Sequence, residues 1–444
     1  MRQRPLAVLS VSVIVFCVAA EVLGLLIFYY QHGWLFYLYP YESVPALIPQ
    51  TANGQLTREG LHPYFGPTHK PGIPFDVPIR ALNWEGVPDG RTSARVPDVL
   101  TNNFGFSSRH DYPFVKSNDR QFVIGIFGGS VGDWFCQLGA GRLVDRLREN
   151  RFFESREVIP ICLSHEGYKQ PQQLLVLAYF LSIGQPLDLV VNISGFNEVT
   201  LSSMNDQRGL DISMPSVMHV DPLINLVNQS TLTPDKLESL AEINRLKRRL
   251  DGLADRLNRA RLASTNVALE QLHAIVSRRY QGELRRFAAL PSMPSGSSVI
   301  HVTPTVKQRT GPVVFEDIAR NWVTSSMLMH AILAARDVSY FDFLQPNQYY
   351  SRRAFTADEA RVALSDESPF KPGVEAGYPA LERALQSGRA NTAGLNIVDA
   401  TRIFDREPSP VYVDNCCHYT ATGNRILADF IAGTILNSKG VWSQ

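Results

Sequence analysis

Three short apolar runs constrain the fold of this 444-residue chain more than any other feature. They cover residues 122–127, 158–163 and 187–193, are rich in Val and Ile, and are each followed after a turn by a helical stretch. Strands of a parallel sheet that is covered on both faces have this continuously apolar character. Repeated strand–helix units predict a doubly wound α/β domain, so we expect a three-layer α/β/α sandwich with a mainly parallel, flavodoxin-like sheet.

Later segments continue the same pattern toward the C-terminus. Further strands are predicted at residues 298–302, 338–344 and 395–398, and the chain closes with a predicted helix over 422–436. His418 is therefore expected on the loop just before the last helix.

Residues with chemical potential follow the first three predicted strands. Ser130, Gly167 and Asn197 each lie just past the end of one strand. In open parallel sheets, ligands bind outside the carboxyl ends of the strands. A serine hydroxyl becomes a good nucleophile when a base takes its proton, and the oxyanion that it creates needs donors already in place. Together with His418, these residues supply the parts of an acyl-transfer site.

The N-terminus predicts a membrane anchor. Arg2 and Arg4 precede a run over residues 5–30 that is apolar except for serines, Glu21 and two small breaks, and no Lys or Arg follows until Arg58. About 20 apolar residues cross a bilayer. The positive-inside bias then places the N-terminus in the cytoplasm and residues 31–444 in the periplasm or outside the cell.

A cleaved signal peptide is the alternative for this N-terminal run. Val18 and Ala20 provide small residues before a cut at Glu21. The anchor is preferred because the apolar run continues past that point. Within lipid, Glu21 is costly unless it is protonated, paired or facing another helix, so we expect it close to the outer face of the membrane.

Composition and patterning divide the chain into parts. With 45% apolar residues and a net charge of +1, nothing indicates a nucleic-acid-binding or disordered protein. The predicted parts are the anchor at 1–30, an irregular extension with short strands at 31–115, the first part of the α/β domain at 116–230, a helical insertion at 231–297, and the second part of the α/β domain at 298–444.

The insertion is predicted to be a pair of amphipathic helices, because leucines and an isoleucine recur at three- and four-residue steps from Leu237 to Leu257. Its basic residues form a possible contact for a protein partner, an acidic polymer or lipid headgroups. A solvated helix face is preferred, since acidic residues are interleaved with them. The basic residues are Lys247, Arg248, Arg249, Arg256, Arg259 and Arg261.

Five cysteines are too few for a disulfide scaffold, and Cys17 lies in the membrane run. An oxidising compartment permits a bridge. If the serine and histidine meet, a disulfide from Cys136 to Cys416 or Cys417 becomes possible. The preferred alternative is that Cys136, Cys162, Cys416 and Cys417 are small buried thiols. Their spacing does not match a zinc site.

Several of these segments resemble the blocks of SGNH hydrolases, the GDSL-type esterase and acyltransferase superfamily, in its membrane-anchored bacterial envelope form. Residues 126–132 read Ile-Phe-Gly-Gly-Ser-Val-Gly, which places Ser130 at the nucleophile position and Gly129 where the family has aspartate. Residues 162–168 place Gly167 at the oxyanion glycine. Residues 195–198, Gly-Phe-Asn-Glu, are similar to the family's Gly-x-Asn-Asp block and place Asn197 as an oxyanion donor.

The last block, Asp-x-x-His, differs in its spacing. Asp414 lies four residues before His418 rather than three, and Asn415 occupies the usual position. Asp414 is preferred as the orienting acid, because a carboxylate stabilises the imidazolium that forms during the reaction. Asn415 is the alternative.

The resemblance implies nucleophilic acyl transfer by Ser130, His418 and Asp414, without a metal or an organic cofactor. The N–H groups of Ser130, Gly167 and Asn197 would hold the oxyanion. Deacylation by water makes the protein an esterase, a hydrolase, whereas deacylation by a sugar hydroxyl makes it an acyltransferase. A membrane anchor with an external domain favours a cell-envelope polysaccharide as substrate, with its acetylation or deacetylation as the reaction.

A second hypothesis follows from the two departures at Gly129 and Asp414. The chain would then be a catalytically inactive SGNH-like protein that binds polysaccharide or scaffolds an envelope assembly, with the helical insertion as its contact.

Overall fold

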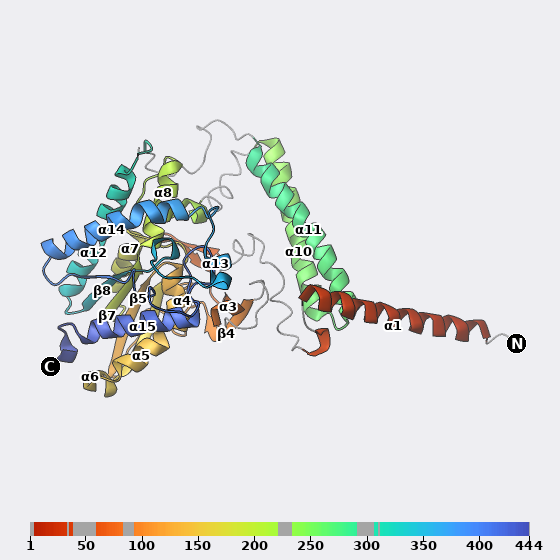
Figure 1. Ribbon diagram of the computed structural model, residues 1–444, viewed down its shortest axis with the longest axis horizontal. Helices are drawn as coiled ribbons and strands as arrows, with labels where there is room; N and C mark the ends of the chain where they lie inside the picture. The colour runs from red at the N-terminus through yellow and green to blue at the C-terminus, as the bar shows by residue number, and fades with distance from the viewer. Residues whose placement is uncertain are drawn as a thin grey trace. The chain divides into compact units, whose positions relative to one another are not determined.

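The computed structural model describes residues 4–32, 35–38, 59–82, 93–220, 233–290, 306–309 and 311–443. Two compact units make up the chain (Figure 1). A helical unit takes in Met1–Thr57, Gly86–Ala94 and Asn225–Ile300. An α/β unit takes in Arg58–Glu85, Arg95–Ile224 and His301–Gln444.

Five described strands form one parallel sheet in the α/β unit, and its strand order is β6-β5-β7-β8-β9. The predicted α/β class and parallel sheet are therefore confirmed. The predicted strand at 298–302 lies outside the described residues. The strands are β5 (Gln121–Gly128), β6 (Glu157–Ser164), β7 (Leu189–Ser194), β8 (Ser339–Leu344) and β9 (Asn396–Asp399).

The central strands are apolar because both of their faces are covered. Every residue of β5 and of β7 is buried. The register pairs Gly128 at the end of β5 with Ser164 of β6 and with Ile193 of β7. The carboxyl ends of three neighbouring strands therefore meet at one edge of the sheet, where the loops that follow them begin.

The helices around the sheet fall into two contacting groups. One group consists of α4 (Ser130–Leu138), α5 (Ala140–Leu147) and α15 (Ala421–Leu436). The other consists of α7 (Gln172–Ser182), α8 (Phe196–Gln207), α12 (Val313–Ala334) and α14 (Lys371–Asn391). The predicted closing helix at 422–436 is confirmed as α15. Shorter elements are α6 (Arg151–Glu154), η5 (Gln348–Tyr350), α13 (Ala357–Ala363) and η6 (Val441–Ser443).

The described part of residues 31–115 contains short strands in two-stranded sheets. The β1–β2 pair lies against α7, where Gln172 Nε2 donates to the Phe65 carbonyl at 2.9 Å and the Phe65 ring contacts Tyr179. The elements are η1 (Phe36–Leu38), β1 (Glu59–His62), β2 (Gly66–His69), β3 (Pro74–Pro78), α3 (Ile79–Leu82) and β4 (Ser93–Leu100).

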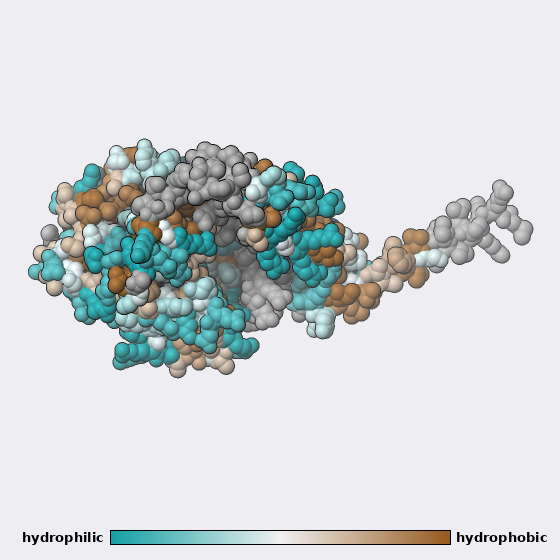
Figure 2. Space-filling model, turned by 90° about the horizontal axis from the view of Figure 1, so that it is seen from above, coloured by the Kyte–Doolittle hydropathy of each residue, from teal (hydrophilic) through white to brown (hydrophobic). Residues whose placement is uncertain are grey.

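In the helical unit, α1 (Arg4–His32) is long and apolar enough over Ser12–His32 to cross a membrane. Figure 2 shows apolar side chains along this helix. By length and composition it fits either a membrane anchor or a signal sequence, the two alternatives that the sequence left open.

The predicted helix pair of the insertion is confirmed as α10 (Pro234–Arg259) and α11 (Ala263–Ala289). Thr233 caps α10 by accepting from the Lys236 N–H, and Pro234 occupies the first turn. The two helices bury one apolar seam between them, because the leucines recur at helical spacing. The seam consists of Ile243, Leu246, Leu250, Leu253, Val276 and Tyr280.

Glu21 of α1 is paired with the start of α11. Its carboxylate accepts hydrogen bonds from the Ala263 N–H at 2.7 Å and from the Ser264 N–H and Oγ at 3.2 and 2.6 Å. A Cβ on Gly24 would lie 2.4 Å from Ser264 N, so α1 and α11 are in close backbone contact there. Glu21 is thus paired with a helix N-terminus, where backbone N–H groups lack intrahelical acceptors. Its expected position close to the outer face of the membrane stays a prediction.

Candidate active site

Ser130 is the first residue of α4 and follows β5 directly. It is partly exposed, while the residues around it on β5 and α4 are buried. A Cβ on Gly132 would lie 2.6 Å from Ser164 Oγ, so the first turn of α4 packs closely on the end of β6. The strand–helix junction thus presents the serine at the carboxyl edge of the sheet.

Asn197 lies beside this junction, in the first turn of α8. Its Nδ2 donates to the Tyr168 carbonyl at 2.8 Å, which connects the loops after β6 and β7. A Cβ on Gly129 would lie only 2.0 Å from Asn197 Nδ2. The glycine at 129 is therefore what allows the Asn197 amide to lie against the residue that precedes Ser130.

Gly167 has a left-handed backbone conformation, with a φ of +76°. The His219 ring occupies the space that a side chain would need, since a Cβ on Gly167 would lie 2.3 Å from His219 Cε1. The preceding turn is closed by the Tyr168 N–H, which donates to the His165 carbonyl at 3.1 Å. The left-handed backbone and the neighbouring His219 ring both require glycine at position 167, the predicted oxyanion position.

A carboxylate organises the loop that carries the histidine. Asp414 Oδ1 accepts from the backbone N–H groups of Cys416, Cys417 and His418 at 3.0, 3.0 and 3.3 Å. Its Oδ2 lies 2.5 Å from His418 Nδ1. Asp414, rather than the exposed Asn415, thus contacts the imidazole. The extra residue in the spacing is accommodated because three successive amides turn around one oxygen.

His418 is also held by Trp134 of α4. The two rings stack with centroids 4.4 Å apart and an interplanar angle of 19°. Trp134 lies one turn after Ser130 on the same helix, and residues four apart share a helix face. Within the described part of the chain, His418 Nε2 is buried and has no hydrogen-bond partner. The ring nitrogen opposite Asp414 is therefore unused.

Electrostatics reinforce the pairing of His418 with Asp414. Burial lowers the pKa of His418, but the Asp414 carboxylate opposes this effect and the pKa is raised above its ordinary value. Burial raises the pKa of Asp414, but His418 and the backbone N–H groups outweigh it and the pKa is lowered. The carboxylate stays ionised and stabilises positive charge on the ring.

Two residues that the sequence analysis missed lie on α4. Trp134 is one, and its i+4 spacing from Ser130 is the signal that would have placed it on the same face. Asp133 is the other: burial raises its pKa well above the usual range, and the Glu166 carboxylate adds to this effect. Asp133 is therefore a buried carboxyl group near the site. A burial effect of this kind depends on packing, so no pattern along the chain indicates it.

Glu198 occupies the position where the family has aspartate. Its buried carboxyl group accepts from the Gly195 N–H at 2.6 Å and from the Gln170 N–H at 3.0 Å. Burial raises the pKa of this group. Glu198 therefore fixes the turn before Asn197 to the loop that follows Gly167.

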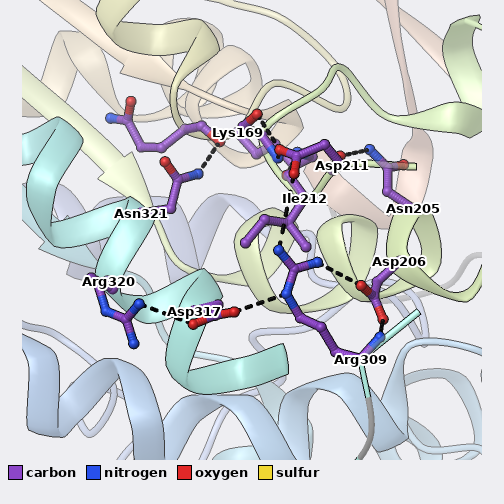
Figure 3. Close-up of polar contacts among 11 residues, drawn as sticks. Lys169, Asn205, Asp206, Asp211, Ile212, Arg309, Asp317, Arg320 and Asn321 are labelled. Atoms are coloured by element: carbon purple, nitrogen blue, oxygen red, sulfur yellow. Dashed lines mark hydrogen bonds and ion pairs between the residues drawn. The ribbon is translucent and has the colours of Figure 1, made fainter. Parts of the chain in front are cut away.

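A polar cluster supports the loop that follows Gly167 from the side of α8 and α12 (Figure 3). Lys169 is fully buried, and its Nζ donates to the Ile212 carbonyl at 2.5 Å. Burial lowers the pKa of Lys169 to about 7. Arg309 binds Asp206 at 2.6 Å and Asp317 at 2.8 Å, which connects residues 306–309 to both helices.

The cysteine predictions require a correction. Cys136 and Cys162 form a disulfide, so Cys136 is not bonded to Cys416 or Cys417, and neither Cys136 nor Cys162 is the free thiol that was preferred. The reason is that α4 packs on β6 and carries residue 136 along that strand. Trp134, not Cys136, contacts the histidine loop.

Cys416 and Cys417 are free thiols, with their Sγ atoms 3.3 Å apart. Together with His418 they form a group of three potential metal ligands, whose ligand atoms lie within 4.8 Å of one another. Among the His, Cys, Asp and Glu residues that the structure describes, no other group of three or more is this close. His418 Nδ1 is already engaged by Asp414.

No protein-family model and no curated protein matches the chain.

Proposed function

We propose that this chain is a membrane-anchored serine hydrolase of SGNH type, an esterase or O-acyltransferase that acts on acyl esters, acetyl above all, of a cell-envelope polysaccharide. One observation carries the proposal. His418 has Asp414 on one ring nitrogen, an unpartnered buried nitrogen on the other, and its ring face on Trp134, one turn from Ser130.

The proposed reaction begins when His418 Nε2 accepts the proton of the Ser130 hydroxyl as Ser130 Oγ attacks the ester carbonyl. The oxyanion rests on N–H groups of Ser130, Gly167 and Asn197, which follow three adjacent strands. The alcohol leaves with the proton from His418. Water or a sugar hydroxyl, deprotonated by His418, then attacks the acyl-serine and releases the acyl group from Ser130 as a free acid or as a new ester.

The proposed architecture is a three-layer α/β/α sandwich with flavodoxin-like strand order. Two observations support this architecture. The sheet order is β6-β5-β7-β8-β9, so the sheet's second strand along the chain, β6, lies outside its first, β5. The helices around the sheet form two contacting groups. The proposed location is a single-pass anchor in the inner membrane with the N-terminus inside and the α/β unit in the periplasm. Arg2 and Arg4 before the apolar helix support that orientation.

Replacement of the proposed nucleophile tests this function. We expect Ser130→Ala to reduce hydrolysis of a short-chain acyl ester by roughly 10⁴- to 10⁶-fold, because removal of a triad member leaves only residual catalysis. A fluorophosphonate probe should label the parent protein and not this variant. Circular dichroism confirms that both are folded.

Ser164→Ala is the matched control. Ser164 ends the neighbouring strand and its Oγ donates to the Ile126 carbonyl at 3.0 Å, so it shares the sheet edge without a place in the proposed chemistry. This variant should keep the label. Equal hydrolysis by parent and Ser130→Ala, or absence of labelling in the folded parent, would contradict the proposal and favour a non-catalytic binding or scaffolding role.

A further inference from the structure

Two adjacent thiols next to the candidate catalytic histidine have no role in the proposed reaction. Cys416 and Cys417 have their Sγ atoms 3.3 Å apart. Cys417 is buried, while Cys416 is partly exposed and is the more accessible of the two residues. The chain's other cysteines are accounted for, since Cys136 is bonded to Cys162 and Cys17 lies in α1.

The backbone around these thiols is held on both sides. Their amides, with that of His418, donate to Asp414 Oδ1. On the carbonyl side, Asn347 Nδ2 donates to the Cys416 carbonyl at 3.0 Å. The position of the Cys416–Cys417 peptide is therefore coupled to the carboxylate that orients His418.

We propose that Cys416 and Cys417 form a redox modification site, in which their oxidation to a vicinal disulfide displaces the Asp414–His418 pair and switches the active site off. The effect on activity rests on the proposed function; formation of the disulfide does not. The existing Cys136–Cys162 bond fits a chain that works where disulfides form.

The oxidant is a disulfide, either of a protein or of a small thiol. The Cys416 thiol loses its proton, and its sulfur attacks one sulfur of the oxidant and expels one thiolate, which leaves a mixed disulfide on Cys416. The Cys417 thiol then loses its proton, and its sulfur attacks Cys416 Sγ and expels the second thiolate. Two protons are released to solvent, two electrons reduce the oxidant to two thiolates, and one S–S bond forms.

The new bond requires the local backbone to move. Adjacent Cα atoms lie about 3.8 Å apart across a trans peptide, whereas disulfides usually join Cα atoms roughly 4.4–6.8 Å apart. The peptide between the cysteines must therefore distort, and its N–H, that of Cys417, moves relative to Asp414 Oδ1, which it contacts. A strained disulfide is also easily reduced, so the modification is reversible.

Thiol counting on the full-length protein in detergent tests the modification. A Cys17→Ser background leaves Cys416 and Cys417 as the only thiols, because all five cysteines are then assigned. The folded protein is treated with oxidised glutathione at mildly alkaline pH, alkylated and analysed by mass spectrometry. We expect the two thiols to be lost together, without retained glutathione, and to return with dithiothreitol.

Ester hydrolysis is measured on the same samples. We expect a roughly 10²-fold loss on oxidation, since small misplacements of catalytic groups have effects of that order, and recovery on reduction. Cys417→Ser, compared with its own untreated sample, should lose little activity and should stop at a glutathione adduct on Cys416. Cys416→Ser should stay unmodified and active, because the remaining thiol, Cys417, is buried. These variants separate the switch from general oxidative damage.

Three outcomes would overturn parts of this inference. Thiols that stay alkylatable after oxidant treatment contradict the modification site. A disulfide that forms without loss of activity contradicts the switch. The third outcome is that the disulfide forms reversibly, but the reduced protein hydrolyses no ester and takes no fluorophosphonate. This outcome supports the modification site and contradicts the proposed function.

Discussion

Two carboxylates, one in each unit, accept backbone amides in the same manner and with different results. In the helical unit, Glu21 binds the amides of Ala263 and Ser264 and the Ser264 hydroxyl. In the α/β unit, Asp414 binds three successive amides with one oxygen and the His418 imidazole with the other.

The two carboxylates differ in the groups that their oxygens contact besides the backbone amides. At Glu21, one oxygen accepts from the Ser264 amide and hydroxyl, and the other accepts from the Ala263 amide and the Tyr37 hydroxyl. These groups do not titrate near neutral pH, so the carboxylate caps α11 and binds Tyr37. At Asp414, the second oxygen meets an imidazole whose other nitrogen is buried and unpartnered. Capping by a carboxylate is thus a structural device in both units, and it supports chemistry only where it also orients a group that can accept a proton.

Among changes that test this comparison, the largest effect is expected from Asp414→Asn. The amide oxygen of asparagine can still accept from the loop, but its NH₂ group faces His418 Nδ1 and favours the wrong tautomer, so ester hydrolysis should fall by about 10⁴-fold. Asn415→Ala is the control, because the Asn415 side chain is exposed. A larger loss from Asn415→Ala than from Asp414→Asn would reverse the assignment of the orienting residue.

Gly129→Ala should have the next largest effect. Its methyl group would collide with Asn197 Nδ2, and displacement of one oxyanion donor typically reduces kcat by about 10²- to 10³-fold. Gly141→Ala in α5 is the matched control, since an added Cβ there meets nothing within 4 Å. Unchanged kcat in a folded Gly129→Ala protein would exclude Asn197 from the oxyanion site.

The pH dependence should follow from the raised pKa of His418. The neutral imidazole is the base, so kcat/KM for a non-ionising ester should rise about tenfold per pH unit while His418 is protonated, and level off above its pKa. The midpoint should lie above the ordinary histidine value of about 6.5. A midpoint at or below that value would show that Asp414 does not stabilise the imidazolium in solution.

The smallest effect is expected in the helical unit. Glu21→Ala removes the cap of α11 and should destabilise its first turn by about 1 kcal/mol. Hydrogen exchange of the Ala263 and Ser264 amides should then be roughly fivefold faster, without a change in ester hydrolysis. Glu238→Ala, an exposed acid on α10, serves as control and should leave these amides unchanged. Equal exchange in the Glu21 variant would mean that the cap does not stabilise the helix.

The elements whose signal is local could be predicted from the amino-acid sequence. The apolar runs that became β5, β6 and β7, the leucine spacing of α10 and α11, and the apolar run of α1 are all periodic patterns that depend on neighbours along the chain. The positions of Ser130, Gly167 and Asn197 at one sheet edge followed from this, because parallel strands share the direction of their carboxyl ends.

The contacts between side chains of the site depend on three-dimensional packing instead. The stack of His418 on Trp134, the space that Gly129 leaves for Asn197, and the Cys136–Cys162 bond all join residues that are distant in sequence or on different elements. They depend on how α4 crosses β6 and on how the loop at Asp414 turns. Such contacts are set by packing in three dimensions, which no spacing along the chain encodes.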